Sequence, residues 1–65
     1  MLIFIPRQTK SWTVYRDTLS IGVIYTDDVS NEIKFFQHSA SVSYEEMIEI
    51  TDRIRGMINA RTKTN

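Results

Sequence analysis

No cysteine occurs in this 65-residue chain, and that absence limits how so short a sequence can stabilise a fold. A domain of this size buries only about 60% of the surface that its unfolded chain exposes. Small domains therefore often add disulfides, a structural metal or a partner chain to a small core. Disulfides are excluded here, and the single histidine, His38, offers too few ligands for an ordinary structural zinc site. We expect neither a metal nor a cofactor, and a domain stabilised by packing or by a partner.

The pattern of apolar residues predicts an antiparallel sheet in the first two thirds of the chain. A hydrophobic fraction of 42% and an aromatic fraction of 11% are typical of an ordered globular protein. Short runs of apolar and β-branched residues alternate with clusters of turn-forming residues, which is typical of strands joined as hairpins. We expect strands over Leu2–Ile5, Ser11–Arg16, Leu19–Thr26 and Glu32–Gln37.

A capping box marks the start of one helix near residue 43. The hydroxyl of Ser43 is spaced to accept the amide of Glu46, and the Glu46 carboxylate is spaced to accept the amide of Ser43. Acidic residues follow the cap and basic residues lie further along, as the helix dipole favours. Apolar side chains recur at helical spacing and predict the face that packs on the sheet, with Tyr44 at its head: Met47, Ile50, Ile54, Met57 and Ile58.

These elements predict an α+β fold, a three- to four-stranded antiparallel β-meander with one C-terminal helix packed on one sheet face. We expect a single domain over residues 1–61 and a disordered tail over residues 62–65. The longest apolar run, Met1 to Ile5, is too short to span a bilayer and does not resemble a signal peptide. We therefore expect a cytoplasmic protein without a membrane partner.

No group of residues in the sequence suggests catalysis. His38 is followed by Ser39, but neighbours on a strand point to opposite faces, and no glycine-flanked nucleophile turn is present. Asp27, Asp28 and Glu32 lack the spacing of a calcium-binding loop. We expect no catalytic residue, no metal site and no small-molecule substrate.

Strand alternation assigns apolar residues to both faces of the predicted sheet. The face that receives the helix is expected to gather Trp12, Val14, Leu19, Ile21, Val23, Tyr25, Ile33 and Phe35. The opposite face then carries Tyr15, Ile24 and Phe36 on three successive strands, where a solvated face is ordinarily polar. An exposed patch of this kind commonly marks an interaction surface.

We therefore predict a protein-binding surface, used for homodimer formation or for docking on another protein. Its residues are Tyr15, Ile24 and Phe36, with Arg16 and Lys34 beside them. Aromatic residues and arginine are the side chains that binding hot spots favour. In the alternative arrangement, the N-terminal run Leu2–Ile5 folds back over this patch and covers it within the monomer.

Charge is distributed unevenly although the chain is neutral overall. Residues 1–26 carry a net charge of +2, residues 27–52 carry −6 and residues 53–65 carry +4. Basic segments of this kind suit contacts with phosphate groups. Nucleic-acid binding through Arg7, Lys10, Arg16 and Lys34 is therefore the alternative function.

Three short strands, led by the stretch Ser11-Trp12-Thr13-Val14-Tyr15-Arg16, and a capped helix resemble the DNA-contacting N-terminal modules of phage integrases and AP2-type domains. The resemblance covers about residues 11–60 and implies contact between DNA and the outer sheet face. The family's face is rich in arginine and lysine, whereas this chain has Tyr15, Ile24, Phe36 and only Lys34 there. In size and style the chain is also similar to small accessory proteins of phages and prophages, a resemblance that implies binding to one host protein.

Overall fold

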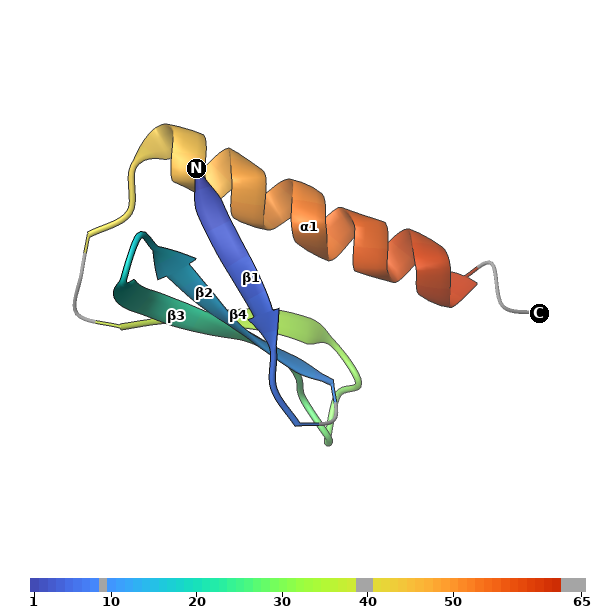
Figure 1. The fold of residues 1–65 in the computed structure, drawn as a ribbon. Coiled ribbons are helices and arrows are strands. Elements are labelled where there is room, and N and C mark those ends of the chain that lie inside the picture. Colours follow the sequence, from blue (N-terminus) through green and yellow to red (C-terminus); the bar gives the residue numbers. More distant parts are fainter. Residues whose placement is uncertain (9, 39–40, 63–65) are drawn as a thin grey trace.

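A computed structural model describes residues 1–8, 10–38 and 41–62 of the chain. Four strands, β1 (Leu2–Pro6), β2 (Ser11–Arg16), β3 (Leu19–Thr26) and β4 (Ile33–Gln37), precede one helix, α1 (Tyr44–Thr62). The strands form one antiparallel sheet in the order β1-β2-β3-β4. The helix lies across one face of this sheet (Figure 1). The predicted α+β meander is confirmed, with all four strands in the sheet.

Each connection between strands contains a residue with a positive φ angle. These residues are Lys10, Asp17 and Asn31, with φ near 60°. Asp and Asn adopt this left-handed conformation more readily than most residues, because their short side chains bond to nearby backbone. Two of the three residues, Asp17 and Asn31, are thus of types that favour this conformation, and each strand pairs with its neighbour in sequence. The prediction of a disordered tail over residues 62–65 was wrong for Thr62, which belongs to α1. Residues 63–65 lie outside the described part of the chain.

A β-bulge in β3 changes which of its side chains face the helix. Val14 pairs with Gly22 and Tyr15 pairs with Ser20, so Ile21 is an extra residue between the two pairs. Both Ile21 and Ile24 are fully buried in the core. Because one extra residue shifts the alternation, the residues of β3 after the bulge face the side opposite to the one predicted.

The sequence-based assignment was therefore wrong for one half of β3. Ile24, predicted on the exposed face, points into the core beneath α1. Val23 and Tyr25, predicted in the core, pair with Phe36 and Lys34 on the face away from the helix. Leu19, also predicted in the core, is half exposed at the end of its strand.

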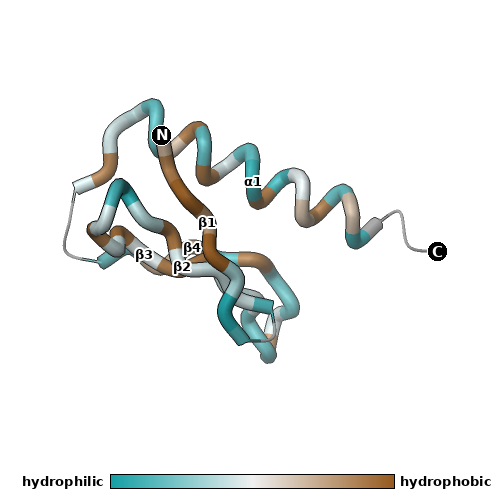
Figure 2. Tube along the Cα trace, viewed as in Figure 1, coloured by the Kyte–Doolittle hydropathy of each residue, from teal (hydrophilic) through white to brown (hydrophobic). Residues whose placement is uncertain are grey.

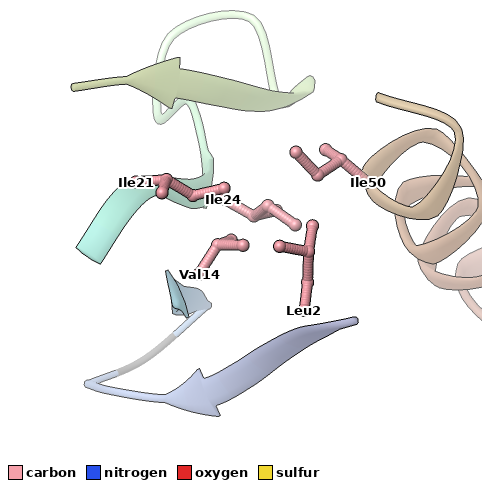
Figure 3. Packing of buried hydrophobic residues seen from close by; sticks show 5 residues of the cluster. All are labelled: Leu2, Val14, Ile21, Ile24 and Ile50. Carbon is pink, nitrogen blue, oxygen red and sulfur yellow. The ribbon is translucent and has the colours of Figure 1, made fainter. Parts of the chain in front are cut away.

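The core is small and lies between the sheet and the first half of α1. Its buried members are Leu2, Val14, Ile21, Ile24 and Ile50, which converge from three strands and the helix (Figure 3). Further side chains pack around them while keeping some exposure: Phe4, Trp12, Ile33, Phe35, Val42, Ile54 and Met57. Brown colour along β1 and alternating colours along α1 show the apolar run and the amphipathic helix (Figure 2).

The predicted capping box is present at the start of α1. The Ser43 amide donates to the Glu46 carboxylate at 3.0 Å, and the Glu46 amide donates to the Ser43 hydroxyl at 3.1 Å. Ile50, Ile54 and Met57 of the predicted helical stripe face the sheet. Met47, Ile58 and the leading Tyr44 are instead exposed, because the contact between helix and sheet is narrower than the apolar stripe.

Candidate functional site

The candidate site is the sheet face opposite α1, called the outer face below. Register places on it the odd-numbered residues of β1 and β2 and, after the bulge, Val23 and Tyr25 of β3. From β4 it receives the even-numbered residues. Its members are Ile3, Ile5, Arg7, Ser11, Thr13, Tyr15, Ser20, Val23, Tyr25, Lys34, Phe36 and His38.

A lateral row of side chains crosses all four strands of the outer face. Ile5 pairs with Thr13, Thr13 with Val23, and Val23 with Phe36. Opposed side chains on one face of a sheet lie close enough to touch. The two ends of the row are the most open, since Phe36 is 60% exposed and Ile5 is 39% exposed. Three of its four side chains are apolar, so we call it the apolar row, and its two ends are accessible on a face that α1 leaves uncovered.

Arg7 follows β1 and bonds to two residues of β2 on the outer face. Its Nε donates to the Thr13 hydroxyl and its Nη2 donates to the Tyr15 hydroxyl, both at 2.9 Å. Thr13 is 9% exposed, whereas Arg7 itself is exposed. The guanidinium is thereby held beside the apolar row, where it can donate hydrogen bonds to a carboxylate of another molecule.

The other side of the face carries His38 and Lys34. The rings of Phe36 and His38 meet edge to face, with centroids 5.8 Å apart, and the His38 Nδ1 lies 3.3 Å from the Ser20 hydroxyl. The Lys34 ammonium lies 2.9 Å from Asp27, which raises the pKa of Lys34 and lowers that of Asp27 to about 2.

The structure separates the five residues predicted for a protein interface. Tyr15, Phe36 and Lys34 lie on the outer face as predicted. Ile24 lies in the core on the opposite face, so the prediction that placed it in this patch was wrong. Arg16 also lies on the helix side, where it bonds to Glu46 of α1.

Sequence reasoning missed four residues of the outer face. Ile3, Ile5, Val23 and Tyr25 belong to the outer face but were assigned to other positions. The alternative in which residues 2–5 fold over the patch and cover it is also wrong. This segment forms β1 beside β2 and extends the outer face by two isoleucines. A glycine inside a strand often marks a bulge, so Gly22 was the available signal for the reversed alternation.

The four cations predicted for nucleic-acid contact do not form one basic surface. Arg7 lies on the outer face, and Lys34 on that face is paired with Asp27. Arg16 faces α1, and Lys10 lies at a turn beside Trp12 and Arg61. Two of the four positive charges are therefore neutralised by neighbouring carboxylates. The other two belong to the connection between β1 and β2, where Arg7 bonds to Tyr15 on the outer face and Lys10 lies beside Trp12.

A second concave region lies between β1, β2 and α1. It is an open groove of about 680 Å³ whose apolar lining includes Phe4, Trp12 and Met57. Arg53 stands over the Phe4 ring at 4.7 Å from its centroid and narrows the groove. Gly56 faces open space here. The carboxylates of Glu49 and Asp52 also line the groove.

Within residues 1–8, 10–38 and 41–62, no three His, Cys, Asp or Glu side chains are grouped to hold a metal ion. The helix that the structure describes is not long and apolar enough to cross a membrane. Comparison of the chain with protein-family models, curated proteins and solved structures finds no match. The resemblance to integrase-type modules and to phage accessory proteins therefore stays a prediction.

Proposed function

We propose that this chain is a non-catalytic protein-binding domain of the cytoplasm that docks through its outer face. The observation that carries the proposal is the apolar row ending in the exposed side chains of Ile5 and Phe36. Open apolar patches on soluble domains commonly mark contacts with other proteins. A domain of this size also gains stability when it buries such a patch.

The chemistry of the face specifies the partner's surface. An apolar centre with a carboxylate at one side complements the row of Ile5, Val23 and Phe36 together with the fixed guanidinium of Arg7. Phe36 fits the role of an anchor, because it is the most exposed side chain of the row and aromatic residues often contribute much of the binding free energy of an interface. Lys34 contributes less charge, since Asp27 already pairs with it.

The proposal is tested with Phe36→Glu and a matched control, Ile48→Glu. Ile48 lies on α1 away from the sheet and is 43% exposed, so the same charge is introduced on another surface. Proteins retained by the wild-type chain from a cytoplasmic extract are identified, and the dissociation constant of the main one is measured for each variant. We expect Phe36→Glu to weaken binding by about thirtyfold, as loss of a hot spot does, and Ile48→Glu to leave it unchanged.

Two outcomes contradict the proposal. The first is equal binding by the wild type and Phe36→Glu, because the apolar row would then lie outside the interface. The second is retention of nucleic acid in place of protein, with an affinity that falls steeply as salt is added. That result would favour the nucleic-acid function predicted from the basic segments.

A further inference from the structure

One side of α1 faces away from the sheet and carries side chains that the core does not use. The sheet-facing side is marked by Ile50, Ile54 and Met57. At about 100° per residue, positions 44, 48, 51, 55 and 58 lie roughly 120° around the helix from these three. All five are exposed, and none of the described strands covers this side of α1 (Figure 1). We call them the helix seam: Tyr44, Ile48, Thr51, Arg55 and Ile58.

The helix seam has the spacing of a surface that packs on another helix. Its members are separated alternately by four and three residues, which is the repeat of two helices packed side by side. Three of them are large and apolar or aromatic, since Tyr44 is 74% exposed, Ile48 43% and Ile58 44%. A second helix laid along the seam would remove this surface from water.

A recess at the start of the seam is a socket for one side chain of such a helix. It is an open recess of about 440 Å³, and Asp52 and Arg55 lie at its rim. Its other lining residues have the spacing i, i+3, i+4 and i+7: Tyr44, Met47, Ile48 and Thr51. In packed helices, four residues at this spacing form the hole that accepts one side chain of the neighbour. Ile58, further along the same seam, is an exposed apolar side chain of the kind that fills such a hole.

The charges of α1 favour an antiparallel copy of the same helix as the occupant. Residues 44–52 carry a net charge of −4, and residues 53–62 carry +3. Antiparallel pairing sets the acidic half of each helix beside the basic half of the other, whereas parallel pairing would bring the two acidic halves together. Glu46 and Arg61 also bond within the chain, so Asp52 and Arg55 are the charged residues closest to the middle of the seam.

We propose that α1 packs antiparallel on α1 of a second copy of this chain, with Ile48 opposite the partner's Ile58. The two-fold axis then passes beside position 53, and each helix supplies one socket and one isoleucine that fills the other's socket. Thr51 lies opposite the partner's Arg55, and Asp52 is the carboxylate nearest to that guanidinium. An isoleucine pair closes each end of this polar centre. Polar groups in the middle of a helix pair fix its register.

The inference goes beyond the proposed function, because the helix seam and the outer face are different surfaces. The seam lies on α1, which covers the other side of the sheet from the outer face (Figure 1). A dimer formed through the seam therefore leaves both outer faces available for docking. The two ideas separate experimentally, since one depends on Ile48 and Ile58 and the other on Phe36.

Sedimentation equilibrium measures self-association of the wild type, Ile48→Glu, Ile58→Glu and Ile3→Glu. The last is the matched control, because Ile3 is half exposed on the outer face and receives the same substitution. We expect a dimer for the wild type and for Ile3→Glu. We expect Ile48→Glu and Ile58→Glu each to weaken the dimer by about a hundredfold, because symmetry places two carboxylates against apolar side chains. Circular dichroism checks that each variant is folded.

The direction of the helices is tested by mixing Ile48→Cys with Ile58→Cys, since the chain has no cysteine of its own. Antiparallel pairing sets these two positions opposite each other, so we expect a disulfide between the two variants. Position 48 then lies ten residues from the partner's position 48, or about 15 Å along the helix axis, which is beyond the reach of a disulfide. Ile48→Cys alone should therefore stay reduced under the same oxidation.

A wild type that stays monomeric as its concentration rises would overturn the inference. So would a disulfide formed by Ile48→Cys alone in place of the mixed one, because the helices would then be parallel. A dimer that survives Ile48→Glu but is lost in Ile3→Glu would overturn it too, while supporting self-association through the outer face. Conversely, loss of the dimer in Ile48→Glu, together with a Phe36→Glu variant that binds another protein normally, would support the helix pair and contradict docking on the outer face.

Discussion

The helix-covered face and the outer face of this sheet are built from alternating residues of the same strands, but their side chains are buried to different extents. On the helix side, Ile24 and Val14 are fully buried, and Arg16 bonds to α1 at the margin. On the outer side, Arg7 covers Thr13 while Ile3 and Phe36 are at least half exposed. The buried side chains that stabilise the fold therefore gather on the helix side, and the outer face keeps more exposed apolar side chains.

Two neighbouring residues of β3, Val23 and Ile24, allow the largest expected difference in stability between the two faces to be measured. Ile24→Ala should lower the free energy of unfolding by about 2–5 kcal/mol, because it opens a cavity in the core. Val23→Ala, one residue earlier on the outer face, should cost clearly less, since Val23 is only partly buried. Urea denaturation of both variants measures the difference. A larger loss for Val23→Ala would mean that the alternation after the bulge is opposite to the one described.

The two glycines give a second, smaller contrast. A Cβ atom at Gly22 would lie 2.5 Å from the Phe35 ring and 2.5 Å from the Phe36 carbonyl oxygen. Gly22→Ala should therefore destabilise the fold by about 1–3 kcal/mol. Apart from its chain neighbours and the adjacent backbone of α1, no atom lies within 4 Å of a Cβ at Gly56, so Gly56→Ala should stabilise by about 0.5–1 kcal/mol. Thermal unfolding compares them, and equal melting temperatures would contradict both expectations.

Acid should weaken the helix-side margin through Glu46. The Arg16 guanidinium and the Ser43 amide lower the pKa of Glu46 to about 2, below its ordinary value of 4.5. A carboxyl whose pKa is lowered in the folded state adds stability above its unfolded pKa and loses it as the pH falls toward the folded value. Unfolding by urea between pH 7 and pH 2 should thus be less pH-dependent in Glu46→Gln.

Asp27 provides the control for that measurement, because its pKa is also lowered to about 2 by Lys34. Asp27→Asn should remove the stability that Asp27 loses when it is protonated in acid. The loss of stability that is due to Glu46 should remain. If the pH dependence of Glu46→Gln matched that of the wild type throughout this range, the ion pair with Arg16 would not stabilise the fold.

The order of elements and the start of the helix could be predicted from local sequence, because each depends on residues close together in the chain. Ser43 and Glu46 are three residues apart, and their reciprocal bonds need no tertiary contact. Strand positions followed from alternation and from turn residues such as Asp17. These signals involve residues close in sequence, so they can be interpreted without knowledge of the fold.

The composition of the outer face could not be predicted as reliably, because it depends on register between strands. A single extra residue at Ile21 exchanged the faces of Val23 and Ile24. The bond between Arg16 and Glu46 spans 30 positions in sequence, and no local pattern indicates it. The alternation rule was sound, but the bulge interrupted it.

The Glu46 carboxylate near the start of α1 takes part both in the helix cap and in a contact with strand β2. Glu46 accepts the Ser43 amide, and it also accepts Nε and Nη2 of Arg16 at 2.6 and 2.7 Å. Releasing the strand would disturb the cap, and fraying of the cap would release the strand. The early turns of α1 and the end of β2 should therefore melt as one cooperative unit. The last turn is held by a different bond, from Arg61 to the Asn31 carbonyl oxygen at 2.8 Å, so it is expected to melt separately from that unit.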